Sequence, residues 1–196
     1  MMIQQQKRQQ REEVIMLSLD NLTYATRKQL QIINNLGGDR NAHRILHEME
    51  KSKLISSIRT EQKVYFLSSK GKELIASNQG ELKKSWITHT LMRNDLYIKL
   101  EMPDSWRKEK PVKWGENKLI PDATFKKAEE FHFVEIDNQQ SMSKNIDKIK
   151  KYKDLSHVIF HQFNHHPTLI WSTISSLRAE KITEACKKEG LKFIVY

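Results

Sequence analysis

The chain has 196 residues, 38% of them hydrophobic and 30% charged, a balance typical of one or two globular domains with charged surfaces. Its net charge of +10 favours a polyanionic partner, with nucleic acid preferred over a membrane surface. A lone cysteine excludes an internal disulfide and a cysteine-built zinc site. The polar N-terminus and the lack of a long apolar run argue against secretion and a membrane span, so we expect a cytoplasmic protein without a membrane partner.

The first predicted elements are two helices with apolar inward faces. Thr26 is suited to the N-cap of the second helix, over residues 27–36, because its hydroxyl can accept a hydrogen bond from an unpaired backbone N–H. A glycine pair then ends that helix. The first helix covers residues 11–22, and its expected inward positions are Val14, Ile15, Leu17 and Leu22.

A third helix and a hairpin follow. Asp39 is suited to cap a helix over residues 40–52. Residues 54–59 and 63–67 favour two short strands, the polar residues between them predict a hairpin tip, and a further helix starts at Ser69. The third helix carries one apolar stripe with helical spacing, formed by Ala42, Ile45, Leu46 and Met49.

Three helices, a hairpin and a closing helix, with the run MEKSKLISSIRTEQKVYFLSSKGKELI, resemble winged-helix DNA-binding domains over residues 11–79. The resemblance implies that the non-core side of the third helix and the hairpin contact DNA. Arginine and asparagine suit these roles because they pair with guanine, adenine or phosphate. The alternative is a solvated face or a surface for protein partners. The candidate DNA-binding residues of this half are Arg40, Asn41, Arg44, His47, Arg59 and Lys63.

The second half, residues 81–196, favours alternating strands and helices. A helical pattern over residues 81–101 precedes strand-like residues 105–115, and strands are expected within 119–127 and over 131–137. Residues 141–155 favour a helix, 168–175 a strand, 176–190 a helix and 191–196 a last strand. A strand–helix–strand crossover predicts parallel neighbours in a mixed sheet. Alternation places Phe131, Phe133 and Glu135 on one face of their strand.

This order of elements, with Pro-Asp at 121–122 and Glu-Ile-Asp at 135–137, resembles the PD-(D/E)xK nuclease fold. The resemblance implies that Asp122 and Glu135 hold Mg²⁺ or Mn²⁺, which polarises a phosphate and activates water. Asp137 occupies the position of the family lysine, which puts cleavage in doubt; it is a candidate third metal ligand. Lys148 from the next helix is the candidate catalytic cation, and its spacing to Tyr152 is similar to a Gln-x-x-x-Tyr helix of RecB-type nucleases.

The same helix, over residues 141–155, offers Lys144 and Lys151 as candidate DNA contacts. The competing interpretation of the carboxylates is structural. Asp122 then ends a strand, and Glu135 and Asp137 form a solvated or salt-bridged edge. The predicted fold class is α/β (α+β overall), an N-terminal winged helix-turn-helix over residues 11–79 followed by a mixed-sheet PD-(D/E)xK nuclease-like domain over residues 81–196.

Taken together, the stretches LDNLTYATRKQLQIINNLG, RILHEMEKSKLISS and FVEIDNQQSMSKNIDKIKKYKDL resemble the replication-relaxation family of plasmids and integrative elements. The resemblance implies a DNA-binding accessory protein in replication or mobilisation of a mobile element. Its expected partners are double-stranded DNA and replication or mobilisation proteins, with a homodimer as a further option. Two alternatives stay open, a metal-dependent endonuclease or nickase and a winged-helix transcriptional regulator.

Two further groups of side chains have simpler interpretations. Four histidines fall between His157 and His166, but Pro167 and the strand-like run HVIFHQF argue against a continuous helix that would align them for a metal. Trp106 and Trp114 lie in a lysine-rich stretch, where aromatic rings can stack on bases. Packing of a hairpin is the favoured role of these tryptophans.

Overall fold

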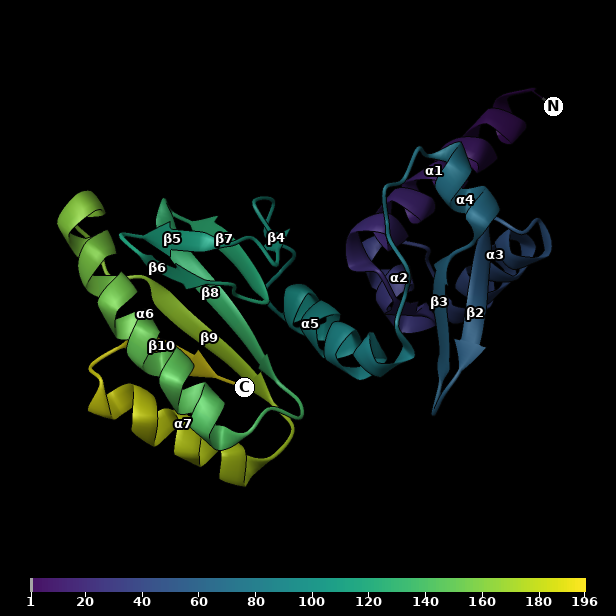
Figure 1. Ribbon diagram of the computed structural model, residues 1–196. Helices are drawn as coiled ribbons and strands as arrows, with labels where there is room; N and C mark the ends of the chain where they lie inside the picture. The colour runs from purple at the N-terminus through teal and green to yellow at the C-terminus, as the bar shows by residue number, and fades with distance from the viewer. Residues whose placement is uncertain (1) are drawn as a thin grey trace. The chain divides into compact units, whose positions relative to one another are not determined.

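The computed structural model describes residues 2–196, and the chain divides into two compact units, Met1–Ile98 and Lys99–Tyr196. Each unit combines helices with a sheet, which confirms the α/β class (Figure 1). The division falls later than the boundary expected near residue 80. Residues 87–98 belong to the first unit because Asn94 donates a hydrogen bond to the Tyr24 carbonyl at 2.6 Å and Asp95 accepts one from Gln29 at 2.7 Å.

The first unit contains helices around a three-stranded sheet of order β1-β3-β2. Its strands are β1 (Ala25–Thr26), β2 (Ile55–Arg59) and β3 (Lys63–Leu67), all paired antiparallel. Its helices are α1 (Met2–Leu22), α2 (Arg27–Ile33), α3 (Asp39–Lys51), α4 (Ser69–Leu74), the 3-10 turn η1 (Lys84–Trp86) and α5 (Ile87–Lys99).

Local sequence explains how α2 and α3 begin and pack. The Thr26 side chain accepts from the Gln29 N–H, and the Gln29 side chain accepts from the Thr26 N–H, so the predicted cap is confirmed as a reciprocal capping box. The predicted stripe of α3 is also confirmed, since its four apolar residues are all buried in the core of this unit. Burial of that stripe directs the opposite side of α3 to solvent.

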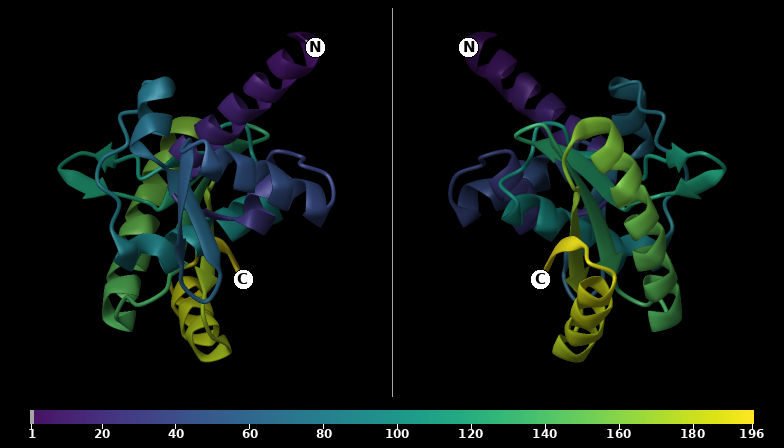
Figure 2. Two further views of the ribbon diagram at one scale, coloured as in Figure 1. Left: turned by 90° about the vertical axis from the view of Figure 1, so that its right-hand side faces the viewer. Right: turned by 90° about the vertical axis from the view of Figure 1, so that its left-hand side faces the viewer.

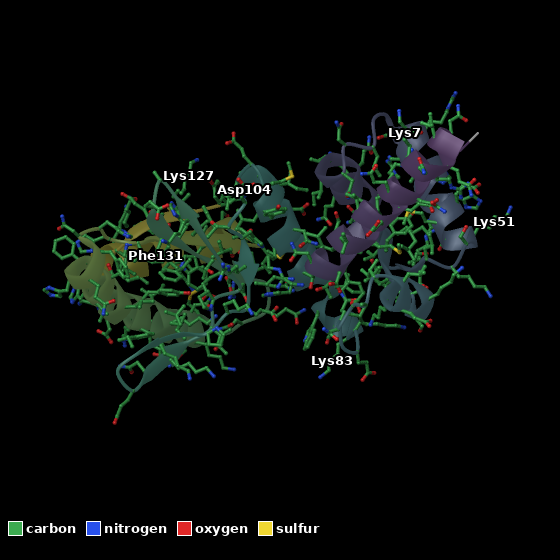
Figure 3. All side chains as sticks on the ribbon, turned by 90° about the horizontal axis from the view of Figure 1, so that it is seen from above. Lys7, Lys51, Lys83, Asp104, Lys127 and Phe131 are labelled. Carbon is green, nitrogen blue, oxygen red and sulfur yellow. The ribbon has the colours of Figure 1, made fainter. Side chains whose placement is uncertain are left out.

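Two features of the first unit depart from the expected pattern. The inward stripe of α1 uses Ile15, Met16, Leu19 and Leu22, whereas Val14 and Leu17 are half exposed because they lie on the other side of the helix. The second departure is the length of α1, which begins at Met2 and not at residue 11. Its N-terminal part extends beyond the other helices of its unit (Figure 2). Lys7 on this helix and Lys51 at the end of α3 both project outward (Figure 3).

The second unit is built on a five-stranded mixed sheet of order β10-β9-β8-β7-β4, with a separate hairpin β5–β6. Its strands are β4 (Arg107–Lys108), β5 (Val112–Trp114), β6 (Asn117–Leu119), β7 (Ala123–Lys127), β8 (Glu130–Asp137), β9 (Thr168–Thr173) and β10 (Lys192–Val195). Its helices are α6 (Met142–Phe163) and α7 (Ser176–Lys188).

The predicted crossovers are confirmed. Strand β8 pairs parallel with β9 after α6, and β9 pairs parallel with β10 after α7, whereas β7 pairs antiparallel with β8. Both helices pack on the face of the sheet that carries Phe133 and Trp171 (Figures 1 and 2). Residues Phe133 and Glu135 point to the same face of β8, so Glu135 lies under α6.

The prediction that residues 157–163 are strand-like and interrupt the helix is wrong. Helix α6 continues through Phe163, because Leu155 and Ile159 extend the buried helical stripe of Ile149 and Tyr152. Asn164, in a left-handed conformation with φ of 57°, then ends the helix. Within residues 2–196 no helix has the length and apolarity needed to cross a membrane.

Candidate functional site

The outward side of α3 is a continuous basic surface. Its residues recur at intervals of three and four, which aligns them along one face of the helix, opposite the buried stripe. They are Arg40, His43, Arg44, His47 and Lys51, and all five are exposed; we call them the α3 basic face. The imidazole rings of His43 and His47 stack with centroids 6.2 Å apart. Such a row of cations and imidazoles offers donors to a polyanion.

The other predicted DNA-binding residues of the first unit differ in their partners. Asn41 donates to the Leu36 carbonyl at 2.8 Å and accepts from Arg44 at 2.9 Å, so its amide holds the start of α3 and orients an arginine. Lys63 pairs with Glu50 at 2.6 Å, which compensates its charge. Arg59 is exposed at the end of β2. Within residues 2–196, Arg40 and Arg44 form no ion pair and keep their charge available.

The predicted carboxylate of the second unit, Glu135, is fully buried under α6. One of its oxygens accepts from the Lys148 ammonium at 2.5 Å, and the other accepts from the Tyr152 hydroxyl at 2.7 Å. The Glu135 side chain is 2% exposed and the Lys148 side chain 25% exposed. Residues 148 and 152 are one turn apart on α6, so both side chains reach the same carboxylate. The structure thus brings together the glutamate, the lysine and the tyrosine that the sequence singled out.

Burial controls the protonation of this group. It raises the pKa of Glu135 from its ordinary 4.5 to about 8, and the nearby charge of Asp122 adds to the rise, while Lys148 and Tyr152 oppose it. Burial, followed by the proximity of Glu135, also raises the pKa of Tyr152 well above its ordinary value. The Tyr152 hydroxyl therefore stays protonated and acts as a donor at neutral pH.

Asp137 ends β8 in a closed hydrogen-bond network. Arg178 from α7 binds it through both carboxylate oxygens, each at 2.6 Å, and Asn145 and Thr173 donate at 2.8 and 3.1 Å. Although burial raises the pKa of Asp137, these hydrogen bonds hold it below its ordinary value. Sequence reasoning missed Arg178, which lies 41 residues from Asp137, and no local pattern links the two.

These contacts do not fit the metal site that the nuclease-like resemblance implies. A divalent ion needs free carboxylate oxygens, and both oxygens of Glu135 and of Asp137 are already engaged by donors. One oxygen of Asp122 accepts from the Ile136 N–H at 2.7 Å. Among the described residues no three His, Cys, Asp or Glu side chains gather into a metal-holding group. The structure thus does not bring Asp122, Glu135 and Asp137 together as one metal site.

The remaining predicted residues lie apart from this network. Lys144 and Lys151 are exposed on α6, on the side away from the sheet. Of the histidines, His157 and His161 lie on α6, His165 stacks on Phe131, and the His166 ring shares a hydrogen bond of 3.0 Å with Ser156.

The two units define an α/β protein. The exposed side of α3 suits a polyanion. The family description "Replication-relaxation" matches residues 16–168, most of the chain, and the protein therefore belongs to the replication-relaxation family.

No curated protein matches the chain. Among solved structures, the crystal structure of protein VC1899 from Vibrio cholerae is similar over 81% of this chain, with 16% sequence identity and a TM-score of 0.39. The chain spans about 40% of the length of that protein.

Proposed function

We propose that the chain is a DNA-binding accessory protein of replication or mobilisation that docks on duplex DNA through the first unit as a winged helix-turn-helix. The single observation that carries this proposal is the α3 basic face, an exposed row of arginine, lysine and histidine side chains opposite a buried apolar stripe. A helix of this kind fits the major groove of B-DNA, where arginine pairs with guanine or with phosphate. Replication or mobilisation proteins are the expected further partners.

The arrangement of elements around α3 supports this mode of docking. A glycine-containing turn joins α2 to α3, as in a helix-turn-helix, and the β2–β3 hairpin follows as the wing. Arg59 at the end of β2 is placed to contact a backbone phosphate beside the groove. Lys63, whose charge is compensated by Glu50, is expected to contribute less than Arg59.

The second unit supports binding in preference to cleavage. Lys148 and Tyr152 each donate to one oxygen of Glu135, so neither oxygen is free for a metal ion. We therefore propose that this unit keeps a nuclease-like arrangement of strands without metal-dependent cleavage. Lys144 and Lys151 then serve as exposed cations for additional phosphate contact.

The test is fluorescence anisotropy with a labelled duplex at low salt. The double variant Arg40→Ala/Arg44→Ala is expected to bind at least tenfold more weakly than wild type, because each arginine contact contributes about 1 kcal/mol or more. The matched control is Lys181→Ala/Lys187→Ala, which removes the same charge from exposed positions of α7 and is expected to bind as wild type. Equal weakening in both double variants would show a general charge effect and would contradict docking through α3.

A further inference from the structure

A groove of about 700 Å³ lies in the second unit between the β5–β6 hairpin, the sheet and the C-terminal half of α6. Its floor is apolar, with Phe133 from β8 and Leu155 and Ile159 from α6. Aromatic rings form its walls, with Trp114 on the hairpin side and Phe131 and Phe163 on the other sides. This volume and these walls suit a flat aromatic ligand.

Of the aromatic rings that line the groove, Phe163 is exposed, whereas Trp114 and Phe131 are partly buried and pack on the core of this unit. Phe163 is 54% exposed at the last residue of α6, and its ring meets Phe131 edge to face with centroids 5.1 Å apart. The Lys126 ammonium, which pairs with Glu129 at 3.2 Å, lies 4.9 Å from the centre of the Phe131 ring. Phe131 is labelled in Figure 3, with Lys127 on the neighbouring strand. An exposed ring at the edge of an aromatic groove is a surface on which a base can stack.

The charged side chains near the groove indicate which class of ligand it can bind. Lys113 and Lys118 lie directly opposite each other in the β5–β6 ladder, on the face of the hairpin opposite to that of Trp114, and Lys118 does not line the groove. Within residues 2–196 neither lysine forms an ion pair. The residues that line the groove include Lys113 and no carboxylate. A ligand with an apolar ring and an anionic backbone complements this combination better than an apolar peptide does.

We propose that this groove takes an unstacked nucleobase of single-stranded DNA, which stacks on Phe163 and Trp114 while Lys113 at the rim holds an adjoining phosphate. The inference rests on the proposed role in DNA binding and deepens it by naming the strand state that the second unit recognises. Stacking on aromatic rings tolerates any base, so the groove is expected to bind single strands with little sequence preference.

The experiment measures the anisotropy of fluorescein-labelled oligothymidine and of an abasic oligonucleotide of the same length. Wild type is expected to bind oligothymidine more tightly, because only that strand offers bases to the groove. Phe163→Ala is expected to weaken oligothymidine binding about tenfold and to leave abasic binding unchanged. Phe163→Tyr, which keeps the ring, is expected to retain wild-type affinity.

The matched control is Phe160→Ala, which removes an equally large ring, 41% exposed, from the same helix but outside the groove. It is expected to bind oligothymidine as wild type. Equal binding of the two oligonucleotides by wild type, or wild-type affinity in Phe163→Ala, would overturn the proposal and would leave the groove to a protein partner. Duplex binding reports on α3 separately, since Phe163→Ala is expected to leave it unchanged and Arg40→Ala/Arg44→Ala to reduce it.

Discussion

The buried pair of Glu135 and Lys148 makes a quantitative prediction about pH and stability. The perturbation is a double-mutant cycle with Glu135→Gln and Lys148→Met. Glutamine keeps an acceptor for Tyr152 at nearly the same volume, and methionine keeps the unbranched stem of the lysine without its charge. Because the Glu135 side chain is 2% exposed, water cannot replace Lys148 as the partner of the carboxylate.

The magnitude follows from the pKa of Glu135, which burial raises to about 8. At pH 9 the carboxyl is largely ionised, and removing Lys148 makes it take up a proton. For a group with a pKa of about 8 this costs about 1.4 kcal/mol more at pH 9 than at pH 6. At pH 6 the carboxyl is largely protonated, and the same substitution removes a hydrogen bond to a neutral group, at a cost of about 1 kcal/mol. The coupling between the two positions is therefore expected to be larger at pH 9.

The stability of the wild-type protein also depends on pH through Glu135. The pKa of Glu135 is about 8 in the folded state and near its ordinary 4.5 in the unfolded chain, so the folded state holds a proton that the unfolded chain has released. The contribution of this group to stability is complete below pH 4.5 and declines as the pH rises towards 8. Glu135→Gln is expected to flatten this part of the stability profile.

The assay is urea unfolding of the wild type, both single variants and the double variant at pH 6 and pH 9. The coupling energy is expected to be about 1 kcal/mol larger at pH 9 than at pH 6. A coupling energy that is the same at both pH values would refute the argument from burial. Equally strong coupling at both pH values would show that Glu135 is ionised throughout.

Three further predictions concern other parts of the chain. A Cβ at Gly71 would lie 2.0 Å from the Leu54 carbonyl oxygen, so Gly71→Ala is expected to lower the free energy of unfolding by about 1–3 kcal/mol. The control Gly80→Ala, with open space around it, is expected to stay near wild type in thermal or urea unfolding. Equal stability of the two variants would contradict this packing. Arg178→Ala is expected to destabilise by about 3 kcal/mol at pH 7, and by less on acidification as Asp137 takes up a proton; a loss that is independent of pH speaks against the pair. Supercoiled plasmid incubated with Mg²⁺ or Mn²⁺ is expected to stay intact, and nicking that follows the protein through purification would contradict the account of the carboxylates.

The sequence predicted best those elements whose pattern is local. The α3 stripe, the capping box at Thr26 and the β2–β3 hairpin follow from spacing and cap chemistry within a few residues. The crossovers of the second unit also follow, since a helix between two strands favours parallel neighbours. The end of α6 was not predictable in this way, because the aromatic and β-branched residues near its C-terminus favour a strand. The helix continues because Leu155 and Ile159 pack in the core, which is a long-range contact.

The candidate site was predictable in composition but only partly in geometry. The resemblance to nucleases singled out Glu135, Lys148 and Tyr152, and the helix after the strand places the last two side chains over the glutamate. The engagement of Asp137 by Arg178 depends on a contact between α7 and the end of β8, which no local pattern encodes. Whether a carboxylate faces a metal or a cation is decided by such long-range contacts, and a short motif does not contain them.

The most direct test of duplex binding through the α3 basic face is the salt dependence of affinity. The logarithm of the association constant is measured against the logarithm of salt concentration for wild type and for Arg40→Ala/Arg44→Ala. Each lost phosphate contact lowers the slope by about 0.9, so the double variant is expected to show a slope shallower by about 2. Parallel lines for the two proteins would contradict the account and would place the DNA contacts elsewhere on the chain.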